Sequence, residues 1–119
     1  MLKSKIGHAL VSIHADSCQR IEGASGYKVA RAANSAIPEI EDRLVACLWD
    51  EYGAATDLPR HPGSITNDML YYHAFQDIAP ETPGAIIEIG FLAADKAILV
   101  FGQDSIAQGI ARALICFLE

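Results

Sequence analysis

Two polar side chains interrupt segments of the sequence that are otherwise largely apolar. His14 closes the run 9–14, ALVSIH, and Glu88 lies near the end of the run 85–89, AIIEI. A carboxylate inside an apolar strand costs free energy unless it is paired, hydrogen-bonded or bound to a cation. Because imidazole and carboxylate groups bind zinc, and a carboxylate can accept a proton from water, this pair predicts a metal site with a general base.

The same two residues also have an ordinary structural interpretation. A histidine at a strand end is commonly held by hydrogen bonds alone, and a glutamate in a strand is commonly satisfied by backbone amides or by an arginine. Arg31, Arg43 and Arg112 are candidates for that arginine. Residue type and spacing therefore leave both interpretations open.

Three short segments read as the strands that must position these side chains. The runs 9–14 and 85–89 are largely apolar, which is typical of parallel strands covered on both faces, and 27–32 is a second, short strand. Ligands of open α/β sheets bind beyond the carboxyl ends of the strands. His14 and Glu88 lie at such ends.

Two amphipathic helices are predicted to flank the sheet. The first begins at Pro38 and stops at Gly53, and the second is capped by Asp104 or Ser105. Apolar strands alternating with amphipathic helices predict an α/β fold with a largely parallel sheet. The apolar faces comprise Ile37, Ile40, Leu44, Cys47, Leu48 and Tyr52 in the first helix, and Ile106, Ile110, Ala113, Leu114 and Phe117 in the second.

The cysteines do not indicate a disulfide framework. Cys18, Cys47 and Cys116 are odd in number and far apart, so we expect Cys47 and Cys116 to be buried free thiols within the helix patterns.

Residue type does not separate a substrate rim from partial burial for the tyrosines. The aromatic residues assigned to the core are Trp49, Tyr52, Phe75 and Phe101, and those considered for a substrate rim are Tyr27, Tyr71 and Tyr72.

Length and composition predict one globular domain over residues 1–119. The chain is 51% hydrophobic and 20% charged, which excludes disorder. No apolar run approaches the roughly 18 residues that span a bilayer, so no membrane span is expected. The net charge of −6, without a basic cluster, makes nucleic acid an unfavourable partner.

Several segments resemble one enzyme family. Residues 11–16, VSIHAD, resemble the SIHAN motif of zinc-dependent N-acetylmuramoyl-L-alanine amidases, and residues 23–29, GASGYKV, resemble that family's GASG turn into a strand. Residues 82–92, TPGAIIEIGFL, are similar to the family's segment containing Glu-x-Gly-Phe-Leu, and 104–118 is similar to its closing helix. The order and spacing agree across nearly the whole chain.

The resemblance implies a cell-wall hydrolase that cleaves the amide bond between N-acetylmuramic acid and L-alanine in peptidoglycan. Two histidines and a glutamate hold zinc in this family, and His14 matches the second histidine. Glu88 matches the glutamate taken as general base. Gly90 would let the chain turn close to the site, with Phe91 and Leu92 packed beneath it. Action in the periplasm or outside the cell is implied, although the start, MLKSK, lacks the features of a signal peptide.

The family's first zinc motif, DPGHGG, and the zinc glutamate that follows it have no counterpart here. We therefore expect the chain to be the C-terminal portion of the catalytic domain, without its N-terminal strands, with an unpaired sheet edge, exposed apolar surface and an incomplete zinc site. The isolated chain is then expected to be inactive. The alternatives are a non-catalytic remnant or binding module that does not hold zinc, and a small-molecule binder in which His14 and Glu88 only satisfy each other.

Other side chains have weaker claims on the site. His73 is the best substitute ligand, His8 has a structural or exposed role, and His61 is solvated. Asp16 and Asp68 are candidates to orient His14 or to line the mouth of the site, and Cys18 is a loop residue; no residue is singled out for substrate binding.

Overall fold

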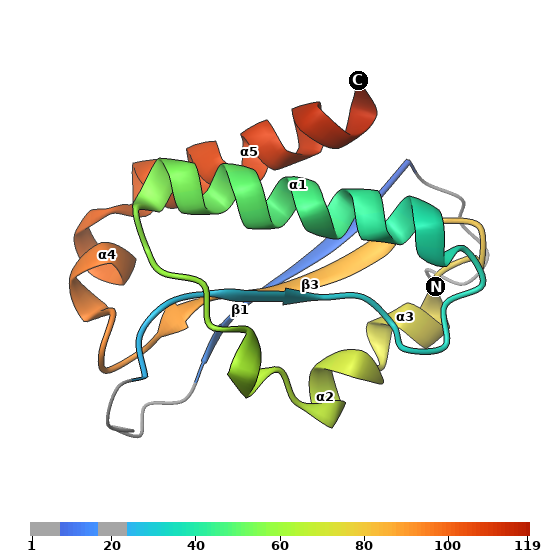
Figure 1. Cartoon of the computed structure of the whole chain (residues 1–119), viewed down its shortest axis with the longest axis horizontal. Coiled ribbons are helices and arrows are strands. Elements are labelled where there is room, and N and C mark those ends of the chain that lie inside the picture. Colours follow the sequence, from blue (N-terminus) through green and yellow to red (C-terminus); the bar gives the residue numbers. More distant parts are fainter. Residues whose placement is uncertain (1–7, 17–23) are drawn as a thin grey trace.

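The computed structural model describes residues 8–16 and 24–119 as a three-stranded sheet with helices on both faces (Figure 1). The strand order is β1–β3–β2. Among the described residues no helix is long and apolar enough to cross a membrane. The elements are β1 (Leu10–Asp16), β2 (Lys28–Ala30), α1 (Pro38–Thr56), a 3₁₀ turn (Pro62–Ser64), α2 (Asn67–Leu70), α3 (Ala74–Asp77), β3 (Gly84–Phe91), α4 (Lys96–Phe101) and α5 (Gln103–Leu118).

The sheet is mixed, so the prediction of a largely parallel sheet is wrong in part. β1 pairs with β3 in parallel, whereas β2 pairs with β3 antiparallel. Between β2 and β3 the chain runs the length of the molecule along α1 and then returns along residues 57–83 (Figure 1). β3 therefore begins at the end of the molecule at which β2 finishes, so the two strands run in opposite directions.

The main core lies between the sheet and two long helices. α1 and α5 pack against each other and cover one face, burying Tyr27, Leu48 and Ile87 (Figure 1). Gly109 of α5 permits the close approach, because a Cβ there would lie 3.0 Å from the Cα of Tyr52. Both helices were predicted, but α1 continues past Gly53 to Thr56, and α5 begins at Gln103 without a side-chain cap.

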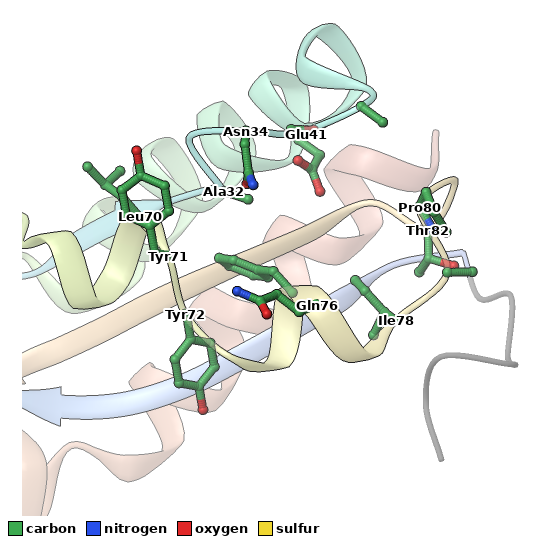
Figure 2. Close-up of a pocket in the computed structure, with 14 residues that line it drawn as sticks. Ala32, Asn34, Glu41, Leu70, Tyr71, Tyr72, Gln76, Ile78, Pro80 and Thr82 are labelled. Atoms are coloured by element: carbon green, nitrogen blue, oxygen red, sulfur yellow. The ribbon is translucent and has the colours of Figure 1, made fainter.

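Short helices cover the opposite face of the sheet. The apolar run 69–72 is too short to decide between strand and helical turn from its sequence, and the structure places its first two residues in the helical turn α2 and Tyr71 at the C-cap of that turn. Ala30, Met69 and Ile86 form a second apolar cluster on this face. A pocket of about 240 Å³ lies at one end of this layer, between the start of α1 and the α3 region (Figure 2).

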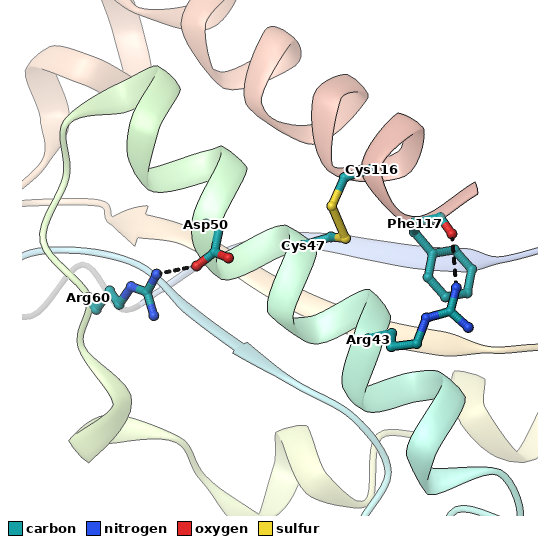
Figure 3. Close-up of a disulfide and its surroundings, with 6 residues drawn as sticks. All are labelled: Arg43, Cys47, Asp50, Arg60, Cys116 and Phe117. Carbon is teal, nitrogen blue, oxygen red and sulfur yellow. Dashed lines mark hydrogen bonds and ion pairs between the residues drawn. A yellow bond between two sulfur atoms is a disulfide. The ribbon is translucent and has the colours of Figure 1, made fainter. Parts of the chain in front are cut away.

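Helices α1 and α5 are joined by a disulfide, so the prediction of free thiols at Cys47 and Cys116 is wrong. The two Cα atoms lie 5.9 Å apart (Figure 3). The guanidinium of Arg43 donates to the carbonyl of Phe117 at 3.3 Å and lies over the Phe117 ring beside it. The sequence pattern placed both cysteines on helix faces, but it gave no information that those faces meet. Cys18 lies outside the described residues.

Several predicted burials are also wrong. Cys116 of α5 and Ile40 of α1, both assigned to apolar helix faces, are exposed. Ile13 of β1 is 53% exposed, because within the described residues β1 pairs only with β3 and the helices lie mainly over β2 and β3. Phe101 is 88% exposed at the end of α4, an unpredicted helix that turns its last side chain away from the core. Tyr52 is fully buried, and Trp49 and Phe75 pack against the two apolar clusters.

Candidate functional site

His14 and Glu88 lie side by side in the sheet. They are register partners in the parallel pair β1–β3, and Lys28 of β2 is opposite Glu88 on the other side. Directly paired residues on neighbouring strands project from the same face. The three side chains therefore form a row across the sheet, in the carboxyl-terminal halves of β1 and β3.

Burial raises the pKa of the Glu88 carboxyl above its ordinary value of 4.5. The nearby carboxylate of Asp16 raises this pKa further, while His14 and Lys28 oppose the rise. One oxygen of the Glu88 side chain, Oε2, is buried without a hydrogen-bond partner among the described residues. A half-buried carboxylate with an elevated pKa and an unused oxygen has the properties of a general base.

Lys28 is the charged residue that sequence reasoning missed. It is only 3% exposed, forms an ion pair with Asp16, and donates hydrogen bonds to the carbonyl and hydroxyl oxygens of Ser64 at 2.7 and 3.0 Å. Its ammonium group also lies 5.4 Å from the centre of the Phe91 ring. A lysine within a short apolar strand was the available signal, because a buried ammonium group needs a partner of opposite charge.

The ring of His14 is held by two hydroxyl groups. Its Nε2 lies 2.9 Å from the hydroxyl of Tyr72 and 3.0 Å from that of Ser12, and the Ser12 hydroxyl also donates to Tyr72 at 3.2 Å. The Tyr72 and His14 rings meet edge to face. No hydrogen bond to Nδ1 of His14 is formed within the described part of the chain. This arrangement fixes the ring and leaves Nδ1 available to bind a ligand.

Asp95 holds the backbone at the end of the sheet that carries this row. Its carboxylate accepts hydrogen bonds from the Ser25 hydroxyl at 2.6 Å and from the backbone N–H groups of Gly26 and Phe91 at 2.9 and 2.8 Å. Gly90 fits against it, since a Cβ at that position would lie 3.2 Å from the Cβ of Asp95. Asp95 thereby links the turn before β2 to the end of β3.

The remaining histidines and acids do not join His14 and Glu88. His8, His73 and Asp68 are exposed, although the ring of His73 contacts that of Tyr72 at a tilted angle, with the ring centres 4.5 Å apart. His61 was expected to be solvated, but it is partly buried, 2.7 Å from the Ser64 hydroxyl and edge-on to the Phe91 ring. Across residues 8–16 and 24–119 no group of three or more His, Cys, Asp or Glu residues could hold a metal ion.

Two expectations about the surroundings of the site need correction. Tyr27 is buried and donates its hydroxyl proton to the carbonyl of Trp49, so it does not form a substrate rim. Phe91 is buried as expected, whereas Leu92 is 42% exposed because it follows the last residue of β3 and turns outward. Tyr71 is exposed and Tyr72 is partly buried, and both line the pocket of Figure 2.

Comparison with known proteins connects this fold with one class of enzyme. No protein-family model and no curated protein matches the sequence. The fold is similar to that of solved N-acetylmuramoyl-L-alanine amidases, which agrees with the fold that the sequence resemblance implied.

Three of these structures show the extent of the similarity. The catalytic domain of CwlV from Bacillus (Paenibacillus) polymyxa var. colistinus is 24% identical with a TM-score of 0.67, and the match covers 93% of this chain and 57% of that one. CwlD from Clostridioides difficile is 18% identical with a TM-score of 0.70, covering 98% and 57%. Ami1 from Mycobacterium smegmatis is 23% identical with a TM-score of 0.67, covering 93% and 54%. The chain thus spans slightly more than half the length of these structures.

Proposed function

We propose that this chain forms part of the catalytic domain of a peptidoglycan hydrolase that cleaves the amide bond between N-acetylmuramic acid and L-alanine. The observation that carries the proposal is the register pairing of His14 with Glu88. These are the two residues that match the family's metal histidine and general base. The fold that the chain shares with solved amidases supports the same function.

In the proposed site His14 is a metal ligand. Because its Nε2 already lies against the hydroxyls of Ser12 and Tyr72, the nitrogen left for the metal is Nδ1. A histidine whose second nitrogen is hydrogen-bonded has a fixed ring orientation, which favours metal binding. Zinc, when bound, supplies a Lewis acid that polarises the amide carbonyl and acidifies water.

Glu88 is the proposed general base. Its elevated pKa makes the carboxylate a better proton acceptor than an exposed glutamate, and its Oε2 has no competing hydrogen bond among the described residues. It takes a proton from the attacking water and passes it to the leaving amine of alanine. Lys28 is engaged by Asp16 and Ser64 and keeps the neighbouring charges paired.

The described residues fit zinc only in part. They supply one imidazole and the base, whereas a catalytic zinc has about three protein ligands. We propose that the other ligands come from polypeptide that corresponds to the upstream motifs of the family. The chain by itself should therefore bind zinc weakly, and sub-micromolar affinity in calorimetry would contradict this division of the site.

The central experiment replaces Glu88 by Gln in the intact gene product. Release of dye-labelled fragments from peptidoglycan should be lost while the zinc content is retained, because the amide keeps the shape of the side chain but cannot accept the proton. Asp68→Asn is the matched control, since Asp68 is exposed and lies outside the row. Unchanged release by the Glu88 variant would reject the base assignment.

The second candidate function is a non-catalytic module of the same fold. The hydrogen bonds of His14 to Tyr72 and Ser12 favour it, because they satisfy one ring nitrogen without a metal. His14→Ala distinguishes the two functions. If the protein is the proposed hydrolase, the zinc content of the intact His14→Ala variant should fall. If it is a non-catalytic module, the variant should bind peptidoglycan as well as the original protein does.

The proposed substrate places the site of action at the cell wall, outside the cytoplasmic membrane. The disulfide between Cys47 and Cys116 supports this location, because such bonds persist in oxidising compartments. Recovery of the oxidised protein from a periplasmic or secreted fraction is the expected result. Recovery of the fully reduced protein from the cytoplasm alone would argue against it.

A further inference from the structure

The pocket of about 240 Å³ lies away from the row formed by His14, Glu88 and Lys28. It is next to Gly84, the first residue of β3, and Glu88 follows four residues later along the same strand. At about 3.3 Å per residue the two positions are separated by roughly 13 Å. The pocket and the row share one neighbour, because Tyr72 lines the pocket and its hydroxyl lies 2.9 Å from Nε2 of His14. The inference below depends on Glu41 and does not require the proposed hydrolytic activity.

Glu41 is a buried acidic residue in the lining of this pocket (Figure 2). The residue is only 5% exposed. Its Oε2 accepts a hydrogen bond from the backbone N–H of Gly84 at 2.7 Å, which satisfies the first amide of β3. Its Oε1 is buried and has no hydrogen-bond partner among the described residues. A buried carboxylate with one unused oxygen is unfavourable unless a positive group approaches it.

The other lining residues suit an organic cation. Three aromatic residues, Tyr71, Tyr72 and Phe75, are among those that line the pocket, and aromatic rings attract cations through their faces. The side-chain amides of Asn34 and Gln76 provide carbonyl oxygens that can accept hydrogen bonds. These groups match the three N–H donors of a primary ammonium group and the methylene chain that carries it.

A metal ion is a poorer match for the same place. Hard cations take several carboxylate, carbonyl or water oxygens, and among the described residues Glu41 is the only acidic one that lines the pocket. No cluster of three or more ligating side chains occurs in the described parts of the chain. An alkylammonium group needs one carboxylate, apolar walls and a few acceptors, which this lining provides.

We propose that this pocket binds a primary ammonium group on a short aliphatic chain, with Glu41 as its counter-charge. The carboxylate neutralises the ammonium group, the aromatic rings contact the methylene groups, and the amide oxygens accept the remaining N–H bonds. The ligand class is thus the amine-bearing side chain of an amino acid or peptide.

The test titrates the full chain with pentylammonium and with 1-pentanol, following backbone amide resonances by NMR. The two probes have the same chain length and differ in charge. Saturable shifts around Glu41 and Gly84 are expected with pentylammonium, and 1-pentanol should bind at least about tenfold more weakly. Equal binding of the two probes, or no saturable shift with pentylammonium, would overturn the proposal.

Two variants assign the binding to the carboxylate. Glu41→Gln keeps an oxygen that can accept the N–H of Gly84 but removes the charge, so pentylammonium affinity should fall about tenfold or more. Glu39→Gln removes an exposed charge from the same helical turn and should bind like the original chain. Undiminished binding of pentylammonium by a folded Glu41→Gln variant would also overturn the proposal. If that variant does not fold, the comparison of pentylammonium with 1-pentanol on the original chain tests the proposal.

Discussion

Removal of the disulfide between Cys47 and Cys116 should cost a large part of the stability of this domain. The two cysteines are 69 residues apart in the sequence, so the bond closes a long loop in the unfolded chain. The chain-entropy relation gives about 4 kcal/mol for a loop of this length at 25 °C. With the entropy of unfolding typical of a domain of this size, the midpoint of thermal unfolding should fall by about 15 °C.

The assay compares thermal unfolding of the oxidised protein with that of the Cys47→Ala, Cys116→Ala double variant by calorimetry. The variant should melt much lower, and a reducing agent should destabilise the original protein while leaving the variant unchanged. Cys18→Ala is the control and should behave like the original protein in both conditions. The argument would be refuted if the non-reduced, denatured protein had three titratable thiols. It would also be refuted if the original protein melted at the same temperature with and without reductant.

Three further predictions concern the site. At pH 7 the Glu88→Gln variant should melt at a higher temperature than the original protein. A pKa raised above 4.5 means that ionisation of Glu88 destabilises the folded state as the pH rises, so the gain should vanish near pH 4, where the carboxyl is protonated. A Gln variant that is less stable at pH 7 would contradict this. Tyr72→Phe should shift the ring ¹⁵N resonances of His14 and weaken zinc binding by the intact protein about 10–100-fold in chelator competition, and unchanged resonances would exclude the hydroxyl contact. Asp95→Ala should lower the free energy of unfolding in urea by about 2–5 kcal/mol, because it leaves the buried N–H groups of Gly26 and Phe91 without an acceptor, whereas a loss below about 1 kcal/mol would argue against that role.

The sequence was informative where one residue contradicts its surroundings. A histidine and a glutamate in apolar runs marked the two strands that turn out to be neighbours, and the helical period located α1 and α5. These signals are local, since each depends on a few consecutive residues. The rule that ligands bind beyond the carboxyl ends of parallel strands assigned His14 and Glu88 to one end of the sheet, but it did not predict that they are direct register partners.

Features that depend on distant segments could not be read in the same way. The ion pair of Lys28 with Asp16, the contact of Tyr72 with His14 and the disulfide all join residues whose proximity is set by the whole fold. The direction of β2 was equally hidden, because a three-residue strand has an apolar pattern but no signal of orientation. Phe101 shows the reverse error, in which an apolar residue type was taken as a sign of burial.

The backbone ladder between β1 and β3 determines the spacing of the imidazole and the carboxylate. That spacing is independent of the connecting loops, so insertions and substitutions in the loops can change what reaches the two side chains without altering the distance between them. New substrate preferences could therefore evolve around this pair while its geometry is inherited with the sheet. An engineer seeking to alter specificity should vary the residues from Leu92 onward that directly follow β3, and should keep both strands and Tyr72 intact.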